Sequence, residues 1–345
     1  MLSRHALPGL VCFLVLFASA GLAQSPPFTQ CPSIGLSPSC AVLIVINPDG
    51  SLKELTDPSV PPFDGVEDTL VGVLNNSGAT VFGISLTGPD IFGFDGDGAG
   101  PGGSYAGPGT SFTITNANSG VVNFPNGLDN NRSLWFSLEG SPSQVRLAST
   151  VTLDPGHGTI KCPKGRTGAT GPTNYPASNP PAGHLLEYVL AFNMANTAKA
   201  RLTALGYQVV MTKTTATACP TYAERTGLAN KSRTNIFVSI HLDGVANQTV
   251  HGSSALYNSN KSSAQTLAQF LVDQVSSSIG VTNNGTKIRN DLAVLKGTSS
   301  RMTAALAEVA TLTNVGGDED VVHNPANVTR AGNAIAAAVN QFVNR

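Results

Sequence analysis

Charged side chains are scarce in this 345-residue sequence. They make up 12% of the residues, against roughly 25% in ordinary soluble proteins. The formal net charge is −1. A nucleic-acid-binding protein is generally strongly basic, and a disordered tail carries a high net charge, so the bulk charge excludes both classes. The length allows about two domains, each with ample core.

Several common motifs are also missing. The sequence has no H-E-x-x-H helix motif, which disfavours the common zinc peptidases, and no G-x-S-x-G motif, which disfavours a serine hydrolase. No C-x-x-C spacing occurs, so we do not expect a cysteine metal site. No segment provides the uninterrupted run of about 20 apolar residues that spans a membrane.

The small net charge conceals two different halves. Residues 24–143 contain 2 Lys/Arg and 11 Asp/Glu, a balance of −9, whereas residues 144–345 contain 17 and 10, a balance of +7. Such asymmetry indicates a division of roles. We therefore predict two domains, 24–143 and 144–345. The basic domain suits an anionic polymer, although salt screens that attraction.

Residues 1–23 are predicted to be a signal peptide. Arg4 and His5 precede an apolar run from Leu10 to Phe17, and small residues follow up to Ala23. A short basic start, an apolar centre and a small-residue end are typical of secretory signals. We expect an exported protein, periplasmic or extracellular, with no stable membrane insertion after cleavage. A retained membrane anchor is the alternative.

Export makes disulfides possible. Four of the five cysteines lie beyond the signal peptide, and they allow three pairings. We favour Cys31–Cys40, which are close in sequence, and Cys162–Cys219, which both lie in the second half. Because each of the latter two follows a predicted strand, we expect their disulfide to hold the long 158–183 loop beside the carboxyl edge of the sheet.

Residues 41–140 carry short apolar runs separated by turns rich in Asn, Gly and Pro. This spacing, without helical periodicity, predicts an all-β, sandwich-like domain. The expected strands are 41–46, 69–74, 80–86, 111–115, 120–124 and 133–138. The Asp90–Gly98 stretch alternates Asp and Gly and could wrap a hard cation such as Ca²⁺. It lacks EF-hand spacing, however, and we favour a plain turn. Nothing in the sequence identifies a partner of this domain.

From residue 144 onward, strands alternate with helices. This alternation predicts an α/β domain with an open, mixed and largely parallel sheet flanked by helices, in which ligands bind at the carboxyl ends of the strands. The expected strands are 147–153, 207–211, 236–240, 254–257, 292–295 and 304–309, and the expected helices are 184–205, 221–233, 262–279 and 328–342.

Two histidines and two carboxylates are expected at that edge. His157 follows the first strand, His241 ends the third, Glu308 lies in the last core strand, and Glu187 lies in the first turn of the first long helix. Each of the last three also has a structural interpretation. His241 could be a buried core histidine, Glu187 a carboxylate that stabilises a helix N-terminus, and Glu308 part of a solvated helix face. His184 is a rival to Glu187.

Two neutral imidazoles and one carboxylate are the ligands of a catalytic zinc ion that keeps a fourth position open. Zinc lowers the pKa of bound water to about 7 and polarises a carbonyl group. A further carboxylate can carry a proton from that water to a leaving amine. Residues of these types therefore point to amide hydrolysis.

The second half of the chain, 151–345, resembles the zinc-dependent N-acetylmuramoyl-L-alanine amidases of the amidase-3 type. The matching segments occur in the family's order. They are Leu153–Gly158, Glu187, Glu224-Arg225 with Ala229-Asn230, Phe237–His241, Asn290–Leu295, and Leu306–Val309 ending at Thr313-Asn314.

This resemblance implies an enzyme of peptidoglycan, associated with the cell wall. It implies that His157, Glu187 and His241 hold one zinc ion and that Glu308 is the catalytic general acid/base. The bond cleaved would be the amide between N-acetylmuramic acid and L-alanine of the stem peptide. No nucleic-acid partner is expected.

Three positions depart from the family pattern: Thr159, Leu242-Asp243 and Ala310-Thr311. They put substrate preference in doubt rather than zinc hydrolysis. Two alternatives stay open. One is a wall-binding protein with an inactive amidase scaffold, and the other is a different zinc-dependent amidohydrolase.

Overall fold

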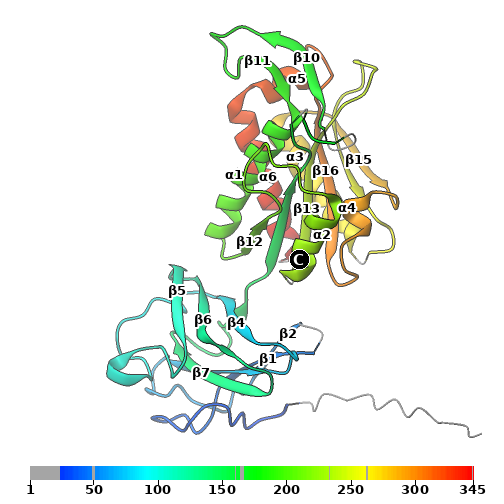
Figure 1. Ribbon diagram of the computed structural model, residues 1–345. Coiled ribbons are helices and arrows are strands. Elements are labelled where there is room, and N and C mark those ends of the chain that lie inside the picture. The colour runs from blue at the N-terminus through cyan, green and yellow to red at the C-terminus, as the bar shows by residue number, and fades with distance from the viewer. Residues whose placement is uncertain are drawn as a thin grey trace, which may run out of the picture.

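The computed structural model describes residues 24–48, 51–159, 161–163, 167–232, 234–261, 263–343 and 345. The predicted signal peptide, 1–23, lies outside these residues. Two bodies are visible: an all-β body formed by β1 to β8 and an α/β body that contains the helices α1 to α6 (Figure 1). Among the described residues, no helix is both long and apolar enough to cross a membrane.

The N-terminal body consists of two four-stranded sheets, in the orders β2-β1-β3-β7 and β5-β6-β4-β8. Apolar side chains from both sheets meet in one core, which makes the body a sandwich. The elements are β1 (Val42–Ile46), β2 (Leu52–Thr56), β3 (Thr69–Asn75), β4 (Val81–Thr87), the 3-10 turn η1 (Pro101–Gly103), β5 (Ser111–Asn116), β6 (Ser119–Leu128), β7 (Arg132–Leu138) and β8 (Arg146–Leu147). β2 was not predicted from the sequence, because Leu52–Thr56 is half exposed and has no clear alternation.

The short strand β8 bears on where the first domain ends. It pairs with β4 through Leu86–Leu147 and Thr87–Arg146, and Val145 is buried in the sandwich core. The strand expected over 147–153 is thus interrupted after β8. We propose that the domain boundary lies just after β8 rather than at residue 143.

The second body is built on a six-stranded sheet in the order β12-β9-β13-β16-β14-β15. β12, β9, β13 and β16 are mutually parallel, and β14 runs antiparallel to β16. The strands are β9 (Thr150–Pro155), β12 (Gln208–Met211), β13 (Ile236–Asp243), β14 (Ser253–Tyr257), β15 (Asn283–Ile288) and β16 (Thr303–Thr311). The helices are α1 (Glu187–Ala204), α2 (Tyr222–Lys231), α3 (Ala264–Ile279), α4 (Ala293–Lys296), α5 (Asp318–His323) and α6 (Pro325–Val343). This is the open, mixed and largely parallel sheet that the sequence predicts.

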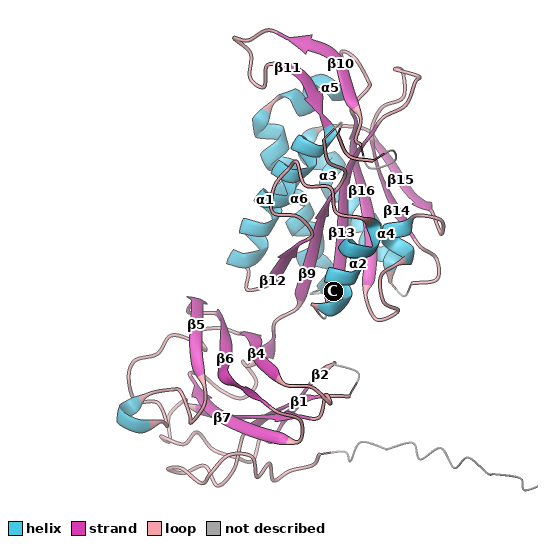
Figure 2. Cartoon of the chain, viewed as in Figure 1, coloured by secondary structure: helices cyan, strands magenta, loops and turns pink. Residues whose placement is uncertain are grey.

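Both faces of this sheet are covered (Figure 2). Along β13, Ile236, Val238 and Ile240 pack in the core that includes α1, α3 and α6, whereas Phe237 packs with α2 and α4. Because side chains alternate along a strand, Ser239 and His241 share the α2 face with Phe237. Alternation along β16 places Glu308 on the same face, and His241 is its register partner.

Two expected segments have different structures. Of residues 292–295, Leu292 is the N-cap of the single helical turn α4 and the other three lie in that turn, so they do not form a strand. The expected helix 184–205 begins only at Glu187, because residues 183–186 form strand β11 (Gly183–Leu186), which pairs with β10 (Thr170–Tyr175). That hairpin is anchored to α5, since the backbone amide and hydroxyl of Thr173 donate to Glu319.

Both expected disulfides are confirmed. Cys31 pairs with Cys40, and Cys162 pairs with Cys219. The second bond joins the segment after β9 to the segment after β12, so it ties together two loops at the carboxyl edge of the sheet. A Cβ atom on Gly158 would lie 2.4 Å from the Cys162 Sγ, so glycine is needed where the loop passes the disulfide.

Candidate metal centre and active site

His157 lies on a tight loop directly after β9. Its φ is +52°, a left-handed conformation that is uncommon for a non-glycine residue. The buried Lys213 holds this loop, because its Nζ donates to the carbonyl oxygens of Gly156, His157 and Ala216. The loop is therefore fixed by a side chain that comes from the end of the neighbouring strand β12.

Glu187 is the first residue of α1, and its side chain is only 3% exposed. Its Oε2 accepts a hydrogen bond from the Ala169 amide at 2.7 Å, and its Oε1 accepts one from the Leu242 amide at 3.2 Å. A helix N-terminus also favours negative charge. Both carboxylate oxygens are thus oriented by backbone groups.

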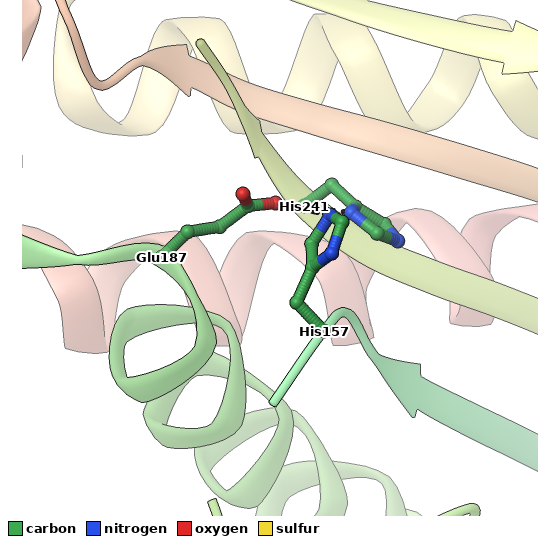
Figure 3. A group of neighbouring side chains, drawn as sticks. All are labelled: His157, Glu187 and His241. Atoms are coloured by element: carbon green, nitrogen blue, oxygen red, sulfur yellow. Dashed lines mark hydrogen bonds and ion pairs between the residues drawn. The ribbon is translucent and has the colours of Figure 1, made fainter. Parts of the chain in front are cut away.

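His157, Glu187 and His241 converge on one point (Figure 3). The Glu187 Oε1 lies 3.4 Å from His157 Nε2 and 3.0 Å from His241 Nδ1. The two imidazole rings stand edge to face with their centroids 4.7 Å apart. One donor atom from each residue lies within 4.8 Å of the other two. The rival His184 is not in this group, and its Nδ1 contacts the Gly171 carbonyl oxygen instead.

The protonation states of His157 and Glu187 suit a cation. Burial and the neighbouring His241 lower the pKa of His157 to about 4, so its imidazole is neutral near pH 7 and has a free lone pair. Burial alone would raise the pKa of Glu187, but the hydrogen bond and charge of His241 and the charge of His157 outweigh it and lower that pKa. Burial would lower the pKa of His241, but the hydrogen bond and charge of Glu187 raise it.

These three residues fit a zinc ion. Bonds of about 2.0 Å in a tetrahedron place ligand atoms about 3.3 Å apart, which is close to the two nitrogen–oxygen distances given above. Two imidazoles and one carboxylate favour Zn²⁺ over Mg²⁺ or Ca²⁺, because the latter two prefer oxygen ligands.

Glu308 lies beside the cluster on the neighbouring strand. Its Oε2 is buried and has no hydrogen-bond partner in the part of the chain that the structure describes. Burial raises the pKa of Glu308 to about 7; the charge of His241 opposes this rise, and the charges of Glu187 and Asp243 add to it. A carboxyl group with this pKa can both accept and release a proton near neutral pH.

The four groups line one open pocket of about 390 Å³. Its other walls come from 167–169 and 242–244. A larger hollow of about 480 Å³ lies between the β sandwich and the start of β9, but none of the described residues that line it is acidic, basic or a histidine. The smaller pocket is therefore the one whose side chains can bind a metal ion or transfer a proton.

A buried ion pair between Arg225 and Asp154 stabilises the strand ends next to the site. Arg225 donates to both oxygens of Asp154, from Nε at 2.6 Å and from Nη2 at 2.5 Å. Thr212 and Ser239 donate to the same carboxylate at 2.6 and 2.7 Å. Burial alone would raise the pKa of Asp154, but these partners lower it. Every one of these side chains is buried, so the network fixes the strand ends that carry His157 and His241.

The sequence analysis named all four groups of the pocket but missed Lys213. A signal was available, since Lys213 follows β12 much as His157 follows β9. The sequence also gave no indication that the Ala169 amide would contact Glu187, because residues 156–183 read as an irregular loop.

The substitution Gly156→Ala is expected to weaken metal binding by about 10- to 100-fold, the usual effect of disturbing a ligand's support. A Cβ atom there would lie 2.3 to 2.7 Å from three atoms of the His241 ring, so the ring must move. Metal content after dialysis against buffered zinc would measure this. Gly227→Ala is the control, because no atom lies within 4 Å of its added methyl group. Equal metal content in the two variants would contradict the role of Gly156.

Part of this chain is similar to known proteins. The chain is 30% identical over 162 residues to the N-acetylmuramoyl-L-alanine amidase AmiC of Neisseria meningitidis, which is 43% of this chain and 37% of that protein. It is 32% identical over 124 residues to AmiA of Salmonella typhimurium, 36% of this chain and 37% of that protein. The matches thus span little more than a third of the length of these relatives.

Among solved structures, Cwp6 from Clostridium difficile is similar with a TM-score of 0.50 and 26% identity, over 57% of this chain and 29% of that one. The family model described as N-acetylmuramoyl-L-alanine amidase (Amidase_3) matches residues 151–341. Because that match covers more than half of the chain and contains all four groups of the pocket, the chain belongs to the N-acetylmuramoyl-L-alanine amidase family.

Proposed function

We propose that the protein is a zinc-dependent peptidoglycan hydrolase that cleaves the amide bond between N-acetylmuramic acid and L-alanine. Family membership supports the reaction class. The observation that carries the proposal is the buried, unpartnered Oε2 of Glu308, in register with His241 and on the same pocket as the other donor residues.

In this proposal His157, Glu187 and His241 hold the metal. A bound zinc ion would supply Lewis acidity, which polarises the amide carbonyl and makes water nucleophilic near neutral pH. The chain contributes the arrangement around it. Backbone amides of Ala169 and Leu242 fix Glu187, and Lys213 fixes the loop of His157.

Glu308 moves the proton. Its Oε2 takes a proton from the attacking water and then gives it to the amide nitrogen as the bond to L-alanine breaks. The products are a carboxylate on the lactyl group and a free amino group on L-alanine. A pKa near 7 suits both transfers, because an acid/base works best when its pKa is close to the working pH.

The remaining features of the chain fit a cell-wall substrate outside the cytoplasm. We propose that the protein is exported and acts in the periplasm or the extracellular space, associated with the wall. The two disulfides are compatible with an oxidising compartment. The pocket walls include Leu242 and Asp243, where the sequence departs from the family pattern, and we propose that substrate preference depends on Leu242.

Two alternatives are disfavoured. A wall-binding protein with an inactive scaffold would have no use for a carboxylate whose buried oxygen lacks a partner, since such a group is costly to keep. A different zinc-dependent amidohydrolase would share the three ligands, and only the bond that is cleaved distinguishes it from the proposed enzyme.

The test is digestion of purified peptidoglycan with and without a chelator, followed by mass analysis of the released peptides. We expect free L-alanine amino termini that vanish with the chelator and return when zinc is added back. Release of the same peptides in the presence of chelator would contradict zinc dependence. Release of fragments cut at other bonds would contradict the proposed substrate bond.

A matched pair of variants tests the ligand assignment in the same assay. His157→Ala should lose both bound metal and activity. His184→Ala should keep both, because His184 is exposed and its Nδ1 is hydrogen-bonded to the Gly171 carbonyl oxygen. Metal loss in His184→Ala would mean that Glu187, the ligand at the start of α1, is misassigned.

A further inference from the structure

A second cluster of acidic side chains lies in the N-terminal sandwich, far from the chemistry described above. Asp68 immediately precedes β3, and Glu139 immediately follows β7. The neighbouring residues Thr69 and Leu138 are register partners, so the two carboxylates lie side by side at one end of this strand pair. Asp97 joins them from the long loop between β4 and β5, which also contains η1 (Figure 1). One oxygen from each carboxylate lies within 4.8 Å of the other two.

In this cluster the carboxylate oxygens that can accept hydrogen bonds outnumber the groups that donate to them. The Tyr105 hydroxyl lies 2.7 Å from Asp97 Oδ1 and 3.1 Å from Asp95 Oδ1, and it also lies within hydrogen-bonding distance of Glu139 Oε1. A hydroxyl carries a single proton and can donate to only one of them. Asp68 is 1% exposed, and both of its oxygens are buried without a hydrogen-bond partner among the described residues. Buried carboxylate oxygens are normally paired, so the Asp68 carboxylate is able to accept a cation.

Among its described residues, no basic side chain of the sandwich supplies that charge. Arg146 in β8 pairs with Glu54, and Lys53 and Arg132 are the only basic residues between positions 24 and 143. Lys53 lies in β2, and Arg132 begins β7, about 20 Å from Glu139 at roughly 3.3 Å per residue. Besides burial, the contributions that raise the pKa of Asp68 most come from the carboxylates Glu139, Asp97 and Asp64.

We propose that Asp68, Asp97 and Glu139 bind a calcium ion that fastens the loop between β4 and β5 to the end of the β3–β7 pair. All candidate ligand atoms are oxygens, which hard cations prefer, and Ca²⁺ accepts irregular arrangements that Mg²⁺ does not. The Asp/Gly stretch 90–98 is therefore only part of the site. Its Asp97 meets two carboxylates that are distant in sequence, which is why the stretch taken alone resembled a plain turn.

The test is calorimetric titration of the purified full-length protein with calcium chloride, together with thermal melting at each calcium concentration. We expect saturable binding of one ion, with a dissociation constant of about 10⁻⁴ to 10⁻³ M, as in extracellular calcium modules. Asp68→Asn and Asp97→Asn should each weaken binding by at least about tenfold, since each removes a charged ligand. Asp97 is exposed, so its variant tests the site without disturbing the core.

Asp90→Asn is the matched control. Asp90 lies in the same Asp/Gly stretch and is exposed, but it is outside the cluster, so this variant should bind calcium as wild type does. Without calcium, Asp68→Asn should melt at or above the wild-type temperature, because one repelling charge is gone. With saturating calcium the order should reverse.

Two results would overturn the proposal. The first is the absence of saturable calcium binding by the wild-type protein up to about 10 mM, ten times the upper dissociation constant expected. A proton shared between Asp68 and Glu139, rather than calcium, would then stabilise the two carboxylates. The second is wild-type affinity in both cluster variants. Neither result depends on the amidase activity, because the two groups of donor residues have no member in common.

Discussion

Glu308→Gln is expected to lower the rate of amide hydrolysis by about 10²- to 10⁴-fold, the usual contribution of a positioned general acid/base, while the zinc content stays near that of wild type. Glutamine has nearly the same shape but cannot accept the proton at Oε2. The rate is measured on purified peptidoglycan, and the bound metal is measured by elemental analysis.

The comparator for this variant is Asp243→Asn. Asp243 lines the same pocket and adds to the rise in the pKa of Glu308, yet we assign it no proton transfer, so this variant should keep most of the activity. If Asp243→Asn loses activity and Glu308→Gln does not, the acid/base is misassigned. If Glu308→Gln loses zinc, Glu308 is a ligand rather than the proton carrier.

Arg225→Ala is expected to lower the free energy of unfolding by about 3–5 kcal/mol, because it leaves the carboxylate of Asp154 buried without its charged partner. That carboxylate is fully buried and, among the described side chains, keeps only Thr212 and Ser239 as donors. The loss should be visible in helical circular dichroism, since α1 to α6 all lie in the α/β body. The single Trp135 lies in β7, so its fluorescence reports on the sandwich separately.

Two further variants sharpen this prediction. Arg289→Ala breaks an exposed ion pair with Asp291 and should leave the helical unfolding transition unchanged, as is usual for surface pairs. Replacing Arg225 and Asp154 together with apolar residues of similar size should recover part of the loss, because no unpaired charge is then left buried. An Arg225→Ala protein that unfolds like wild type would contradict the supporting role of the pair.

The residues of the pocket were predictable because each lies at or near the carboxyl edge of the parallel strands, where ligands bind in this fold class. His157 and His241 end strands, Glu187 begins a helix, and Glu308 interrupts an apolar strand. Such positions are visible in a single sequence as polar residues at the ends of apolar runs. The register that sets Glu308 beside His241 follows from sheet order, which the sequence does not display.

What the sequence hid depends on distant contacts. The apolar run 292–295 is too short to distinguish a strand from a helical turn by pattern. In the structure, Val294 and Leu295 pack with Ala229 and Phe237 as part of the helical turn α4. The β10–β11 hairpin has the composition of a loop and is anchored through Thr173 by Glu319, 146 positions away. Likewise, Asp68 and Glu139 are unremarkable in sequence, because only the pairing of β3 with β7 brings them together.

The order of strands in the six-stranded sheet has a consequence for solubility. The most apolar strands, β13 and β16, are paired on both sides, so their backbone groups are unavailable to a second chain. The edge strand β15 consists largely of the polar residues Asn283–Lys287 and contains an irregularity where it pairs with β14. Charged and irregular edges prevent sheets from joining edge to edge. β15 therefore protects the apolar interior strands from edge-to-edge pairing with a second copy of the chain.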